Sequence, residues 1–143
     1  MAADLLSIPS TYSLILELAA LVILWTGFAI QRRRTYRRHG FTMSIALAAH
    51  AVAILTVMVN TFRGYFAVPG GANFGDSLFL LIFIHATIGV VVLILGIYLV
   101  GAWGFRKETK GCFKRKRIMI ATFTLWMVAI LLGVTIYAWI TGI

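Results

Sequence analysis

Charged side chains are scarce in this sequence, and the apolar ones that replace them are the first clue to its class. Charged residues make up 12% of the 143 residues, and 62% of the residues are hydrophobic. A soluble globular domain usually carries about twice that share of charge. A fold in water could not bury so much apolar surface. The composition therefore excludes a soluble domain and predicts a chain that lies in a lipid bilayer.

Reactive motifs are also lacking. Cys112 is the only cysteine, so no disulfide framework and no Cys-x-x-Cys pair is available. The sequence has no glycine-rich phosphate loop and no Ser/His/Asp order. Four membrane spans of about 20 residues would use nearly all of the chain, which leaves no room for a soluble catalytic domain. We therefore predict that the protein is not an enzyme.

Positive charge is present in excess, but it is confined to two places. The formal charge is +9, and twelve of the thirteen Lys and Arg residues fall in residues 32–38 and 106–117. Apolar runs flank both stretches, which is the pattern of cytoplasmic loops, so both termini are predicted to lie outside the cytoplasm. This placement argues against nucleic-acid binding. It favours docking of anionic lipid headgroups or of a protein partner on these stretches. The candidate docking residues are Arg32, Arg33, Arg34, Arg37, Arg38, Lys114, Arg115, Lys116 and Arg117.

Four long apolar runs remain between the charged stretches. They cover residues of about 12–30, 41–61, 77–103 and 118–140, and none shows the period-two polarity of barrel strands. The sequence predicts an all-α fold, an integral membrane antiparallel four-helix bundle in a single transmembrane domain spanning residues 1–143. Asp76 or Ser77 is expected to cap the third helix. Residues 62–75, rich in glycine and aromatic residues, are expected to form an irregular external loop.

Two histidines fall inside the apolar runs, where polar groups are costly and call for an explanation. His50 is expected near the bilayer midplane, and His85 within one or two helical turns of the same depth. Two imidazoles so placed are typical of ligands to haem b or to a copper ion. The alternative is that each is a buried histidine bonded to a hydroxyl or a carbonyl.

Glu17 and His39 complete the polar residues in or beside the spans. Glu17 lies on the same outer side as Asn60, Asp76 and His85, so these groups are predicted to face one metal or small-molecule site. The alternative is that Glu17 reaches the membrane interface. His39 closes a run of basic residues at the inner boundary, where an interfacial position is expected.

Three short motifs resemble those of the CtaM-like (YozB-like) family of small membrane proteins. They are His39-Gly40-Phe41-Thr42-Met43, then Phe83-Ile84-His85, then Trp126, Gly133, Val134 and Tyr137 in the last run. The resemblance covers roughly residues 30–140. One departure is Arg115, which stands where the family has a histidine in a Lys-His-Arg-Lys run.

The resemblance implies a role in the maturation of haem-copper terminal oxidases, with His39 and His85 as the functional histidines. His50 is not part of the family's motifs. Three hypotheses follow for a multi-pass protein of a prokaryotic cytoplasmic membrane. The first is a non-catalytic factor that aids assembly or maturation of a haem- or copper-containing respiratory complex such as a terminal oxidase. The others are a structural accessory subunit of a larger membrane enzyme complex and a b-type cytochrome with a haem between His50 and His85.

Overall fold

The computed structural model describes residues 2–104 and 114–143, with side chains from residue 11 onward. Cys112 and the first part of the second basic stretch therefore lie outside the described residues. The described chain is helical, and four of its helical stretches are long and apolar enough to cross a membrane. The predicted all-helical, multi-pass character is confirmed at this level.

The first and last spans extend beyond the apolar runs that predicted them. Helix α1 covers Ala2–Arg32 and so begins ten residues before the predicted start. Alanine and leucine at its beginning are strong helix formers, which carry the helix past the apolar span of Thr11–Arg32. Helix α6 covers Lys116–Thr141 and ends at Gly142, whose φ of 73° is the left-handed geometry that glycine adopts at helix ends.

The second span is one continuous helical rod with a change of pitch. It consists of α2 (Tyr36–Ala53), a π-helical turn η1 (Ile54–Met58) and α3 (Val59–Ala67). The rod is longer than the predicted 41–61 and takes up half of the expected external loop. It ends at Val68, which is extended because Pro69 follows it.

Aromatic packing explains why the helix continues through α3. The ring centroids of Tyr65 and Phe79 lie 5.2 Å apart, and those of Phe62 and Phe79 lie 6.5 Å apart. Phe79 belongs to α4 (Ser77–Trp103) and is fully buried. These aromatic residues of the expected external loop thus join α3 to α4.

Helix α4 has the bounds predicted for it. The Asp76 carboxylate accepts a hydrogen bond from the backbone N–H of Leu78 at 3.0 Å, as expected of the capping residue. Gly104 ends the helix in a left-handed conformation.

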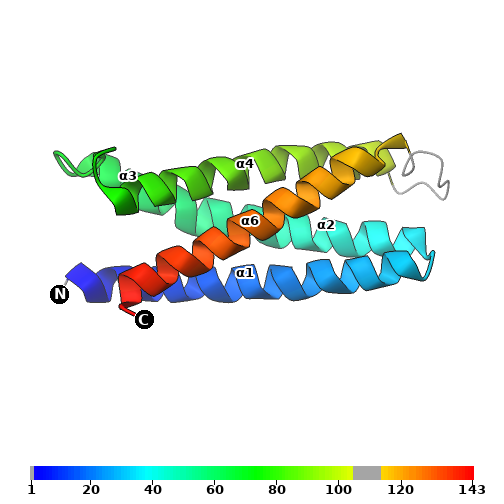
Figure 1. Cartoon of the computed structure of the whole chain (residues 1–143), viewed down its shortest axis with the longest axis horizontal. Coiled ribbons are helices and arrows are strands. Elements are labelled where there is room, and N and C mark those ends of the chain that lie inside the picture. Colours follow the sequence, from blue (N-terminus) through cyan, green and yellow to red (C-terminus); the bar gives the residue numbers. More distant parts are fainter. Residues whose placement is uncertain (1, 105–113) are drawn as a thin grey trace.

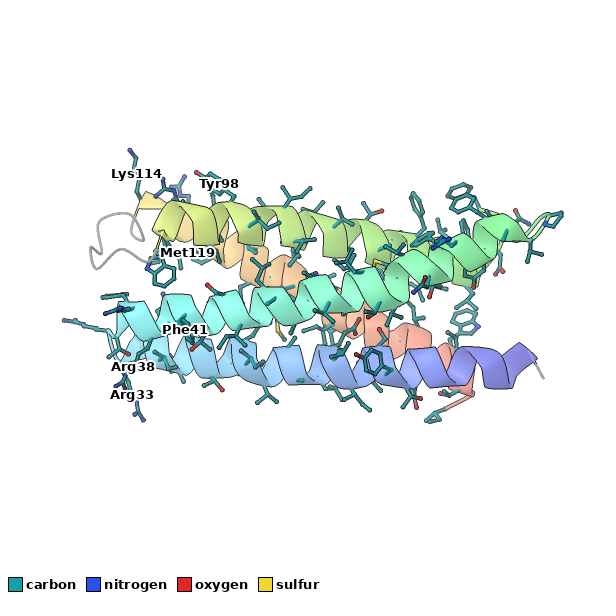
Figure 2. The ribbon with its side chains drawn as sticks, turned by 180° about the vertical axis from the view of Figure 1, so that it is seen from behind. Arg33, Arg38, Phe41, Tyr98, Lys114 and Met119 are labelled. Carbon is teal, nitrogen blue, oxygen red and sulfur yellow. The ribbon has the colours of Figure 1, made fainter. Side chains whose placement is uncertain are left out.

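The four long helices pack in a ring. Helix α1 contacts α2 and α6, and α4 also contacts α2 and α6, so α1 faces α4 across one diagonal and α2 faces α6 across the other. Helix α6 crosses the bundle obliquely, and the two termini lie at the same end (Figure 1). Arg33, Arg38 and Lys114 lie together at the opposite end (Figure 2), which we call the basic end.

The turn between α1 and α2 contains one strained residue. Arg34 has a φ of 58°, which costs a non-glycine residue about 1–2 kcal/mol. We expect Arg34→Gly to unfold at a higher temperature than Arg34→Ala, by an amount corresponding to about 1 kcal/mol. Both variants lose the same charge, so thermal unfolding in detergent isolates the backbone effect. Equal melting temperatures would show that the turn is unstrained.

Candidate functional site

A carboxylate and an imidazole meet in the middle of the bundle, across the α1–α4 diagonal. Nε2 of His85 lies 3.3 Å from Oε1 of Glu17, and the two side chains are 13% and 14% exposed. Nδ1 of His85 lies 2.9 Å from the carbonyl oxygen of Ala129 in α6. The His85 ring therefore links α1, α4 and α6. The Glu17 side chain is directed into the bundle.

Hydrogen-bond chemistry fixes part of the protonation of this pair. A carbonyl oxygen only accepts, so Nδ1 of His85 carries a hydrogen and donates it to Ala129. Nε2 is then the ring nitrogen that faces the Glu17 carboxyl. A proton shared between these two groups would make the pair neutral overall, which lowers the cost of placing it within a bilayer.

Gly133 of α6 makes room for the Glu17 carboxyl. A Cβ atom added at Gly133 would overlap Oε2 of Glu17. Among the described residues Oε2 is also a buried oxygen with no hydrogen-bond partner. A side chain at residue 133 and the Glu17 carboxyl therefore compete for the same space.

His50 occupies the other diagonal. Its Nε2–H donates to the carbonyl oxygen of Gly89 in α4 at 3.0 Å. Its ring lies 5.0 Å, centroid to centroid, from the indole of Trp126 in α6, tilted by 52°. The π-helical turn η1 begins four residues after His50, and such turns are frequent beside functional sites.

The space between these groups is small. A cavity of about 10 Å³ is bordered by Glu17, His50, His85 and Trp126, together with small and aliphatic side chains. This volume suits one water molecule. A haem between His50 and His85 would require Nε2 of His50 to leave the Gly89 carbonyl, Glu17 to leave Nε2 of His85, and the helices to separate. The described packing therefore does not fit a macrocycle there.

The predicted grouping around Glu17 is reduced to two members. The Asn60 amide donates to the carbonyl oxygen of Thr56 at 2.7 Å, and Asp76 caps α4. Within residues 2–104 and 114–143, no three His, Cys, Asp or Glu side chains come together as a metal site. Glu17 and His85 are close as predicted, but Asn60 and Asp76 belong to local helix structure.

His39 differs from the interfacial residue expected. It is 6% exposed, and Nδ1–H donates to the carbonyl oxygen of Gly27 in α1 at 2.8 Å. Helices α1 and α2 approach closely here, as shown by the overlap that a Cβ at Gly27 would make with the end of the Met43 side chain. His39 also lines a second, much larger cavity.

This second cavity opens at the basic end and has a volume of about 570 Å³. All four long helices line it. Its walls are mainly apolar and aromatic, and its polar side chains include those of Gln31, Tyr36, His39, Arg115 and Lys116. Nε of Arg115 donates to the Tyr98 hydroxyl at 3.3 Å, which holds the guanidinium beside α4. Trp126 borders both cavities and separates them.

Most of the predicted basic docking residues are exposed. Arg32, Arg33, Arg34, Arg37, Arg38, Lys114, Lys116 and Arg117 are exposed, and Arg115 is half-buried. The Arg32 guanidinium lies 4.9 Å from the centroid of the Phe28 ring. Of these basic residues, Arg115 and Lys116 line the large cavity.

No protein-family model, curated protein or solved structure matches this chain.

Several residues of the site contribute only backbone atoms, so the sequence could not single them out. Gly89 and Ala129 act through backbone carbonyls, which any residue possesses. If the protein were an accessory subunit, Gly89, Gly96 and Gly101 of α4 could present a small-residue face to neighbouring subunits. However, a Cβ at Gly89 would contact His50, and one at Gly96 would overlap Leu47. Gly101 alone of these three faces open space.

Proposed function

We propose that this protein is a non-catalytic membrane factor that aids assembly or maturation of a haem- or copper-containing respiratory complex. The observation that carries the proposal is the cavity of about 570 Å³ at the basic end, apolar within and positively charged at its mouth. Such a site suits a membrane-soluble molecule with an acidic group, held for delivery to a partner. The motifs shared with the CtaM-like family support the same role.

The proposal includes an orientation. With the basic end in the cytoplasm, both termini lie outside it, and the four spans form an antiparallel bundle in a prokaryotic cytoplasmic membrane. The large cavity then opens toward the cytoplasmic leaflet. A cysteine-accessibility experiment tests this. In a variant that combines Arg37→Cys with Cys112→Ser, the single cysteine should react only with reagents that reach the cytoplasm.

The accessory-subunit and b-type cytochrome hypotheses have less support. An accessory subunit needs small-residue faces for its neighbours, and only one of the three glycines considered for that role faces outward. A haem held by His50 and His85 has no space between them, since that cavity is about 10 Å³.

Filling the large cavity tests the function. We expect Ala102→Trp to lower the amount of assembled oxidase in the host membrane to near the level of a deletion strain, because Ala102 lines the cavity. Gly101→Trp is the matched control, since Gly101 is the adjacent residue and faces open space. Oxidase is measured by the reduced-minus-oxidised spectrum of membranes and by oxygen uptake.

Two results would contradict the proposal. Normal oxidase in the deletion strain would remove the assembly role. Equal loss with both tryptophan variants would show that the cavity is not what matters. If the Ala102→Trp protein instead co-purifies stably with an oxidase that is fully active, the accessory-subunit hypothesis is favoured.

A further inference from the structure

We propose that the cavity at the basic end binds haem, with Nε2 of His39 as an axial ligand and Arg115 and Lys116 pairing with the haem carboxylates. This inference rests on the proposed function and names the ligand that the factor carries. It places the haem site at the basic end and not between the two midplane histidines.

The imidazole of His39 is prepared for ligation. Nδ1–H is committed to the carbonyl oxygen of Gly27, so the neutral ring carries its lone pair on Nε2. A ligating histidine usually donates its other ring N–H to a carbonyl or carboxylate in this way, which fixes both the tautomer and the ring orientation. His39 lines the large cavity. His50, by contrast, uses its Nε2–H to bond Gly89.

The cavity has the size and the walls that a flat macrocycle needs. Its volume of about 570 Å³ is within the range of about 300–1,000 Å³ typical of ligand pockets. Aromatic rings of Phe28, Trp103, Phe123 and Trp126 line it, and such rings pack well on a macrocycle. The thioether groups of Met43 and Met119 also line it, and methionine is a known second axial ligand of haem iron.

Charge at the mouth matches the acidic edge of haem. Arg115 and Lys116 line the cavity where it meets the basic end, and no acidic side chain is among its lining residues in the described chain. Arginine pairs with carboxylates in a fixed, bidentate geometry, and the Arg115 guanidinium would turn from its contact with the Tyr98 hydroxyl to do so. An anionic phospholipid would satisfy the same charges, but it has no use for a buried imidazole with its lone pair on Nε2. His39 therefore favours haem.

The test is a titration of the full-length protein, purified in detergent without haem, with haem b. We expect a red-shifted Soret band that saturates at one haem per chain in the wild type. His39→Gln should lose the axial-ligand spectrum and bind at least 10-fold more weakly. The double variant Arg115→Gln/Lys116→Gln should keep the spectrum but bind about 10- to 100-fold more weakly, because charge-assisted hydrogen bonds are lost.

Folding is controlled by circular dichroism of each variant. His39→Gly supplies a second measurement, because added imidazole should restore the ligand spectrum if His39 is the ligand. An unchanged spectrum and affinity in His39→Gln would overturn the inference. So would native mass spectrometry that finds an anionic phospholipid which haem does not displace.

The inference and the proposed function fail in different ways. If the deletion strain lacks oxidase but the purified protein binds no haem, the function stands and the inference fails. If the protein binds haem through His39 but the deletion strain assembles oxidase normally, the site stands and the assembly role fails.

Discussion

His85→Ala is expected to destabilise the bundle by about 3–5 kcal/mol, the usual cost of removing one partner from a buried ion pair. The substitution leaves the Glu17 carboxyl without its partner on α4, and it also releases the carbonyl oxygen of Ala129. Both groups lie in helices long and apolar enough to span the membrane, where bulk water does not replace the lost bonds. The measurement is reversible unfolding in mixed detergent micelles.

A double-mutant cycle separates the pair from general loss of packing. Glu17→Gln should cost much less than His85→Ala, since an amide N–H can still donate to a neutral imidazole. His85→Ala should cost less in a Glu17→Leu background, because no carboxyl then remains unpaired. Additive effects of the two single variants would show that Glu17 and His85 do not interact.

Gly133→Val is expected to be about as damaging, with a loss of roughly 3 kcal/mol or more. Overpacking costs about 1–3 kcal/mol by itself, and here the new side chain also displaces the Glu17 carboxyl, because a Cβ at this position would overlap Oε2. Gly101→Val is the control, since a Cβ there meets open space. Unfolding in micelles and the yield of monodisperse protein report the effect.

The cause of the stability loss expected for Gly133→Val can be tested with a second substitution. Glu17→Ala removes the group that a side chain at residue 133 would strike. Gly133→Val should therefore cost clearly less in that background than in the wild type. An equal cost in both backgrounds would place the obstruction elsewhere in the α1–α6 contact.

The spans were predictable because they depend on composition over about 20 residues. Helix α4 kept its predicted bounds, since Asp76 caps one end and glycine terminates the other. The second span was predicted too short. Its extension depends on aromatic contacts with α4, such as Tyr65 with Phe79, and these join residues distant in sequence. The π-helical turn had no sequence signal that we recognised.

The membrane layer of the site residues was predictable from the sequence, but the directions of their side chains were not. Counting residues placed Glu17 and His85 in the same layer of the membrane, and they do meet. Counting could not show which way each helix is rotated, so Asn60 and Asp76 were grouped with them although each bonds within its own segment. His39 was expected at the surface because basic residues precede it, whereas the close approach of α1 at Gly27 buries it.

The link between Glu17 and His85 has a consequence for how the chain is made. Glu17 is synthesised in the first span and its partner in the third, so during biogenesis the carboxyl enters the membrane before any imidazole on α4 exists. Insertion scales put the penalty for an acidic residue at the centre of a span at about 2.5–3.5 kcal/mol. We therefore expect the first hairpin to gain stability in the membrane when the second hairpin emerges and His85 reaches Glu17.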